Sequence, residues 1–114
     1  MLHEMTLFPR PYASIASGQK TIELRLYDEK RQSIQIGDQI RFTNTEDASQ
    51  TTLCEVVGLH VFKDFRELYE KLPLLQCGYT PEDVDNAHPD DMLTYYSKEK
   101  QAQYGVVGIE LKRI

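Results

Sequence analysis

The sequence predicts an α+β domain built on a small curled sheet, mixed or antiparallel, with short helices beside it. Three observations lead to this fold class. About five or six segments have the alternating or apolar character of strands, turns or short helices separate them without a regular βαβ rhythm, and no linker, repeat or low-complexity stretch interrupts them. With 114 residues, of which 40% are hydrophobic, the chain can bury a core of its own. We therefore expect a single domain over residues 1–114.

The N-terminal part predicts a strand, a short helix and a second strand. Residues 3–8 mix apolar and polar side chains as a first strand does. Pro9 and Pro11 start a helix, because the missing N–H of proline is tolerated in a first helical turn, and Gly18 ends it. Residues 20–27 then alternate and predict a strand with one apolar face.

This second strand brings several charged side chains together. Its apolar face holds Ile22, Leu24 and Leu26, and its opposite face holds Thr21, Glu23, Arg25 and Tyr27. A carboxylate, a guanidinium and a phenol therefore share one face. Lys20 has the parity of the apolar face, so it stays charged only at the strand end, where its ammonium reaches water or a cleft.

The middle of the chain predicts a hairpin. Residues 28–33 form a charged bend after the second strand. Two further strands are expected at residues 39–43 and 52–62, because each is rich in β-branched and apolar side chains. The polar residues 45–50 between them predict a hairpin loop.

The C-terminal half predicts short helices before a closing strand. Asp64, with Glu67 three residues later, is a capping-box start, and Pro73 ends that helix. Further helices are expected to start at residues 80–83 and 89–91. A polar helix is expected at residues 97–104, and the closing strand at residues 106–111.

Composition narrows the function classes. The net charge is −5, so a nucleic-acid surface must be a local basic patch. No segment approaches the length and apolarity needed to span a membrane. Cys54 and Cys77 lack metal-ligand spacing and the histidines are scattered, so we expect no metal, no cofactor and no disulfide framework. We expect a cytosolic, bacterial protein whose oligomeric state the sequence leaves open, a monomer included.

Three motifs give a resemblance to a known family. Residues 18–25 read G-x-K-T-x-E-x-R, residues 34–42 read I-x-x-G-D-x-I-x-F, and residues 104–110 read Y-G-V-V-G-I-E. This pattern resembles the ASCH domain, a relative of the PUA RNA-binding domain. The resemblance covers essentially the whole chain, and it implies a PUA-like curled β-barrel with a cleft between its sheet and flanking helices.

The resemblance also implies a class of function. The family is associated with binding of RNA or nucleotides, and Lys20, Glu23 and Arg25 would line the cleft. Some members are hydrolases, including a branch that acts on N4-acetylcytidine and one associated with ribonuclease activity. In the first branch a threonine nucleophile stands three residues after the cleft lysine, where this chain has Glu23, and residues 74–76 lack that branch's glutamate. This departure argues against amide hydrolysis by that mechanism.

The charged residues leave several interpretations open. Without the resemblance, Glu23 and its neighbours are most simply an ion pair on a surface strand. Lys30 and Arg31 belong to a charged turn that is either solvated or in contact with phosphate.

Three functional hypotheses follow. In a binding module, Lys20 and Arg25 meet phosphate or a base edge, Glu23 accepts from an exocyclic amine, and an aromatic side chain stacks on the base. In an enzyme acting on RNA or a nucleotide, Glu23 is the general base and Lys20 stabilises developing negative charge. In the third hypothesis, the domain is a protein-interaction adaptor without a nucleic-acid role. The sequence favours the first hypothesis, with weak binding.

Overall fold

A computed structural model describes residues 1–114, and its central feature is one curled sheet of five strands. The strands are β1 (Leu2–Leu7), β2 (Ile22–Leu26), β3 (Gln39–Asn44), β4 (Asp47–Phe62) and β5 (Val106–Arg113). Their order in the sheet is β1-β3-β4-β5-β2. The β1–β3 pair is parallel and every other pair is antiparallel. This mixed half-barrel confirms the predicted α+β, PUA-like fold class.

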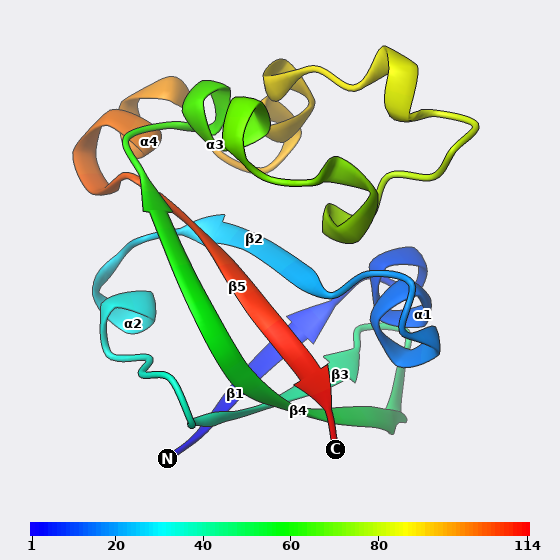
Figure 1. Ribbon diagram of the computed structural model, residues 1–114. Coiled ribbons are helices and arrows are strands. Elements are labelled where there is room, and N and C mark those ends of the chain that lie inside the picture. The colour runs from blue at the N-terminus through cyan, green and yellow to red at the C-terminus, as the bar shows by residue number, and fades with distance from the viewer.

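Short helices surround the sheet, and most of them form one layer above it (Figure 1). The α-helices are α1 (Pro9–Ser17), α2 (Glu29–Gln32), α3 (Phe65–Lys71) and α4 (Lys98–Tyr104). Three 3-10 helices are η1 (Leu74–Cys77), η2 (Val84–Asn86) and η3 (Pro89–Thr94). We call α3, η1, η2, η3 and α4 the helical layer. In Figure 1, β2 runs between this layer and the rest of the sheet, whereas α1 and α2 lie at the two sides. None of these helices combines the length and apolarity of a membrane span.

Two hydrophobic cores lie on opposite sides of β2. One core fills the inside of the curl and includes Phe42, Val107 and Ile109. The other packs Ile22, Leu24 and Leu26 against the helical layer, with Phe65 and Leu68 of α3 fully buried, and Val106 of β5 joins it. The predicted alternation of β2 is therefore confirmed. Its apolar face is buried under helices, which places its charged face toward the inside of the curl.

The free edge of β1 is contacted by two side chains, one from the other edge strand, β2, and one from α2, instead of by a backbone ladder. Arg25 Nη2 donates to the carbonyl oxygen of Thr6 at 2.9 Å, and Lys30 Nζ donates to the carbonyl oxygen of Glu4 at 3.0 Å. Both acceptors belong to β1. Unpaired edge carbonyls need partners, and these two cations supply them.

Some elements differ from their predicted form for local reasons. Residues 28–33 contain the short helix α2, because the Asp28 side chain accepts from the backbone N–H of Arg31 and caps it. The hairpin loop at 45–50 is shorter than expected, since β4 begins at Asp47. No α-helix follows the start signal at residues 80–83. The residues after it are mostly polar up to Pro89, so only the 3-10 turn η2 forms and it buries no side chain.

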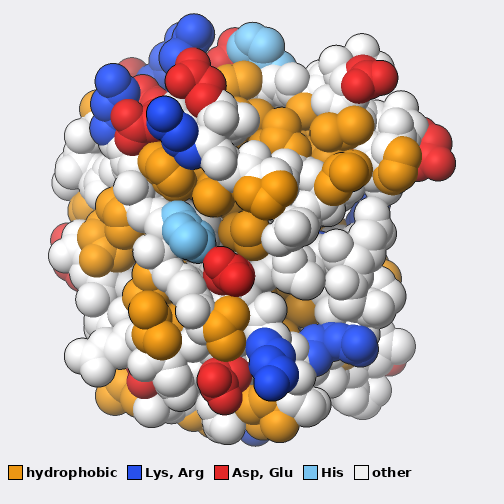
Figure 2. Space-filling model, viewed as in Figure 1, with side chains coloured by type: hydrophobic (Ala, Val, Ile, Leu, Met, Phe, Trp, Pro, Cys, Tyr) orange, Lys and Arg blue, Asp and Glu red, His pale blue; other side chains and the backbone are white.

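The surface gives no sign of a broad basic face on the side shown in Figure 2. Basic and acidic side chains are interspersed there at the top and the bottom, and hydrophobic side chains gather over the helical layer between them. Any binding of a negatively charged ligand on this acidic chain therefore depends on a local site.

Candidate functional site

A cleft of about 500 Å³ lies at the free edge of β2, between the end of β1 with α1 on one side and the helical layer on the other. It is lined by the end of β1, the first turns of α1, the residues around η1, and η3 with the residues that follow it. Lys20, Glu23 and Arg25 all line this cleft. Its volume lies in the range typical of small-molecule sites. We call these three residues the cleft floor.

The cleft floor is a buried carboxylate held by two cations. Lys20 Nζ lies 2.7 Å from Glu23 Oε1, and Arg25 Nε lies 2.7 Å from Glu23 Oε2. The side chain of Glu23 is 4% exposed, and those of Lys20 and Arg25 are 11% and 14% exposed. The interpretation of these residues as a surface ion pair is therefore wrong. Sheet register explains the burial, because Glu23 and Arg25 stand opposite Ile109 and Val107, which belong to the core inside the curl.

Electrostatics keep Glu23 ionised. Burial by itself raises the pKa of a carboxyl group, but the charges of Lys20 and Arg25 and their hydrogen bonds outweigh it and lower the pKa of Glu23 below 4.5. The pKa of Arg25 is raised, because the neighbouring carboxylate outweighs its desolvation. Glu23 is therefore a weak base at neutral pH, and a general base with so low a pKa is inefficient.

Backbone hydrogen bonds fix the position of the floor. The N–H of Lys20 donates to the carbonyl of Ser14 at the end of α1, at 3.0 Å. The N–H of Thr21 donates to the carbonyl of Gln76 in η1 at 2.9 Å, and the N–H of Leu111 donates to the carbonyl of Thr21 at 2.8 Å. Lys20 thus lies just before β2, with its ammonium in the cleft, as its parity predicted. Sheet, α1 and helical layer meet at this point.

Aromatic side chains line the cleft together with the cleft floor. Phe8 and Tyr95 line it, and they are 59% and 57% exposed. Tyr96 also lines the cleft and stacks on buried Phe65, with ring centroids 6.0 Å apart. The sequence predicts that an aromatic side chain stacks on the base, but it does not single out Phe8. The available signal was its place next to Pro9, at the junction of a strand and a helix, where a hydrophobic side chain has no core to enter.

A chain of hydrogen bonds crosses the helical side of the cleft. The hydroxyl oxygens of Tyr69 and Tyr79 lie 2.7 Å apart, and the Tyr79 hydroxyl donates to Asp91 Oδ2 at 2.7 Å. Burial raises the pKa of Tyr69 to about 12, although the hydrogen bond with Tyr79 acts in the opposite direction, and burial together with the hydrogen bonds to Tyr69 and Asp91 raises the pKa of Tyr79 further. Both remain neutral phenols at neutral pH. Sequence reasoning missed this group, because its three members come from α3, a loop and η3.

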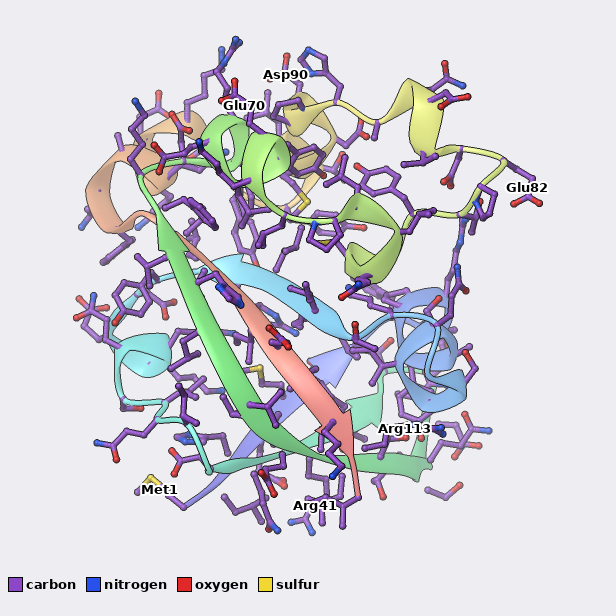
Figure 3. All side chains as sticks on the ribbon, in the orientation of Figure 1. Met1, Arg41, Glu70, Glu82, Asp90 and Arg113 are labelled. Atoms are coloured by element: carbon purple, nitrogen blue, oxygen red, sulfur yellow. The ribbon has the colours of Figure 1, made fainter.

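An ion pair spans the mouth of the cleft. Arg10 Nη2 in α1 lies 3.6 Å from Asp83 Oδ2 in the turn before η2. Figure 3 shows the neighbouring residue Glu82 at the tip of this turn, on the same side of the molecule as α1. Both partners of the ion pair are solvent-exposed, so the pair stabilises the closed mouth only slightly.

Lys30 and Arg31 do not line the cleft. Lys30 donates to the carbonyl of Glu4, and Arg31 Nη1 lies 3.1 Å from Asp28 Oδ2. Only Nε of Arg31 is a buried donor without a partner. The structure therefore brings Lys20, Glu23 and Arg25 together and places the other two predicted binding residues outside their group.

The cysteine of the cleft is not an activated nucleophile. Burial raises the pKa of the Cys77 thiol to about 11, so the thiol in the cleft stays protonated at neutral pH. Thr21, the residue next to the cleft lysine, lines a separate cavity and donates its hydroxyl to Gln76 Oε1 at 3.4 Å.

Comparison with known proteins agrees with the resemblance found in the motifs. The family model for the ASCH domain matches residues 5–114, which is nearly all of the chain. The chain belongs to the ASCH domain family. No curated protein matches it.

Solved structures show the same fold over the full chain. The crystal structure of hypothetical protein PH0355 is similar at 33% identity, with all of both chains covered and a TM-score of 0.82. The solution NMR structure of PF0455 from Pyrococcus furiosus is similar at 32% identity, with 100% of this chain and 98% of that chain covered and a TM-score of 0.73. The crystal structure of ASCH from Zymomonas mobilis shares 13% identity over 97% of this chain and 66% of that chain, with a TM-score of 0.67, and it supports the fold alone.

Proposed function

We propose that this ASCH domain binds a nucleotide unit, free or within single-stranded RNA, in the cleft above Lys20, Glu23 and Arg25. The observation that carries this proposal is the pairing of a buried, charged floor with exposed aromatic walls in one cleft. Proteins recognise unpaired nucleotides by stacking the base on an aromatic ring and by hydrogen bonding its edges.

Each floor residue has a role that its geometry supports. Lys20 and Arg25 supply hydrogen-bond donors for a base carbonyl or a phosphate oxygen. Glu23 uses one lone pair of each oxygen on these cations, which leaves acceptor capacity for an exocyclic amine. Because the floor is assembled before the ligand arrives, little conformational entropy is lost on binding.

The charge balance of the cleft favours a base over a run of phosphates. Its lining contains three cations, Arg10, Lys20 and Arg25, and three carboxylates, Glu23, Asp83 and Asp91. A formally neutral cleft gains little binding free energy from contact with several phosphates. We therefore expect micromolar or weaker binding with a shallow dependence on salt, equivalent to about one phosphate contact.

Exposed aromatic side chains make the sharpest test. Tyr95→Ala and Phe8→Ala remove candidate stacking surfaces and leave the buried floor intact. Binding of fluorescently labelled single-stranded RNA is followed by anisotropy. It should weaken by about 1–3 kcal/mol in the variant that removes the ring on which the base stacks. Ile36→Ala is the matched control, since Ile36 is 66% exposed and does not line the cleft.

Unchanged affinity in both aromatic variants would place the binding surface elsewhere. No binding to the wild-type domain would favour the protein-adaptor hypothesis. Cleavage of the RNA during the assay would favour the hydrolase hypothesis, despite the low pKa of Glu23.

A further inference from the structure

The Tyr69–Tyr79–Asp91 chain has a fixed direction. The carboxylate of Asp91 has no proton to give, so the hydroxyl of Tyr79 donates its single proton to Asp91. Tyr79 then cannot donate to Tyr69. Their oxygens are 2.7 Å apart, so the hydroxyl of Tyr69 must be the donor in that contact.

Both phenol protons are therefore used inside the protein. The oxygen of Tyr69 has only lone pairs left for a ligand, and so has that of Tyr79. The position of Asp91 is fixed by a second contact, because its Oδ2 also accepts from the backbone N–H of His88 at 3.2 Å and forms part of the cap of η3. These two tyrosines and Asp91, which we call the helical wall, accept hydrogen bonds from a ligand and donate none, whereas the hydroxyls of Thr94, Tyr95 and Tyr96 line the same cleft outside this chain.

The floor opposite this wall has the reverse character. Lys20 and Arg25 present N–H donors to the same cleft. The two sides are close: a Cβ placed on Gly78, the residue before Tyr79, would lie 3.2 Å from Cδ of Lys20 and 3.8 Å from its Nζ. Because the floor and the wall line the same cleft, one planar ligand in it can meet the donors of the floor and the acceptors of the wall together.

We infer that the cleft selects bases that carry both a carbonyl and an amino group, because the Tyr69–Tyr79–Asp91 chain makes its helical wall accept hydrogen bonds only. Cytosine and guanine have this pattern. Uracil has a carbonyl where cytosine has its amino group, and hypoxanthine has only a hydrogen where guanine has its amino group. Either base would leave a desolvated acceptor of the helical wall unpaired. This inference rests on the proposed nucleotide-binding function and names the class of base.

Two matched pairs of ligands test it. Guanosine and inosine 5′-monophosphates differ only in the amino group, and cytidine and uridine 5′-monophosphates differ in the amino group, which uridine replaces by a carbonyl, and in the proton on N3. Isothermal titration of the wild-type domain should show tighter binding of the amino-bearing member of at least one pair, by about fivefold or more, the value of one hydrogen bond. In Tyr79→Phe the hydroxyl of Tyr69 is free to donate, so the ratio should fall close to one. In Tyr69→Phe one of the two phenol acceptors is gone and the oxygen of Tyr79 remains, so the ratio should fall below the wild-type value.

Tyr104→Phe is the control, since Tyr104 lies outside the cleft, and it should keep the wild-type ratio. Thermal unfolding shows which variants are folded, and two independent tyrosine variants guard against the loss of one. Equal affinity within both pairs for the wild type, or a ratio that persists in both cleft variants, overturns the inference but not nucleotide binding. Failure of all four nucleotides to bind overturns the proposed function, and the inference with it.

Discussion

Residues 20–25 and residues 28–31 are both rich in charged side chains, but the fold places these side chains in different environments. In the first segment, Lys20 and Arg25 hold a carboxylate that is almost fully buried beneath a cleft. In the second segment, Lys30 and Arg31 contact a backbone carbonyl of β1 and the cap of α2. The difference follows from the position of each segment relative to the sheet. Side chains on the inner face of the curled strand β2 project into the molecule, whereas in α2 Lys30 is exposed and Arg31 is held by the capping residue Asp28.

The largest expected difference between the two segments is in stability. Arg25→Ala removes one partner of a buried ion pair and should lower the free energy of unfolding by about 3–5 kcal/mol. Lys30→Ala loses one hydrogen bond to the Glu4 carbonyl and should cost about 1 kcal/mol or less. Urea unfolding of both variants measures this contrast. Equal costs would mean that the floor is no better buried than α2. Arg25→Ala is for the same reason a poor probe of ligand binding.

The second prediction concerns pH. Because the pKa of Glu23 is lower in the folded chain than its ordinary 4.5, the stabilisation from its charge is complete above that pH and is lost as the pH falls through the folded-state pKa. Glu23→Gln should therefore be less stable than the wild type at pH 6, and the gap should narrow toward pH 3. Urea midpoints at several pH values give the result. A gap that stays constant or widens in acid would show that Glu23 is not held as a carboxylate.

A smaller effect is expected on ligand binding outside the cleft. Lys30→Ala and Arg31→Ala should change nucleotide affinity by less than about twofold, because neither residue lines the cleft. Anisotropy titrations at one salt concentration provide the comparison. A larger loss in Arg31→Ala would extend the site toward α2, where Nε of Arg31 is an unpaired buried donor.

The last prediction is the absence of turnover. The purified domain should release no cytidine from N4-acetylcytidine, because Glu23 stands where the amidohydrolase branch has its threonine nucleophile, and a carboxylate lacks the hydroxyl that forms the acyl-enzyme. Chromatography of the reaction over time checks this. Turnover that disappears in both Lys20→Ala and Glu23→Gln would make the floor catalytic.

Much of the fold was predictable from local pattern. The alternation of residues 20–27 gave the correct faces of β2, and the Asp64 cap and the Pro73 stop gave α3. The start signal at residues 80–83 failed because a cap cannot hold a helix without an apolar face to bury. That residues 1–114 make one domain, and that the protein is cytosolic and bacterial, remain predictions.

The site was predictable only in part. The Lys20–Glu23–Arg25 group was found because its members are close in sequence and on one strand. Tyr69, Tyr79 and Asp91 were missed because they meet only after the segment between α3 and η3 folds over the sheet. The burial of Glu23 was also hidden, since a charged residue on an alternating strand normally faces water.

The most direct test of the account is a nucleotide titration followed by backbone amide NMR. If the cleft binds the nucleotide, the amides of Phe8, Gly78, Tyr79 and Tyr95 shift together with one dissociation constant, and those of α2 do not. The central claim is that the buried floor and the aromatic side chains of the cleft form the binding site. It would be contradicted by shifts confined to α2, or to the ion pair of His60 in β4 and Glu110 in β5, with no change at the four cleft amides.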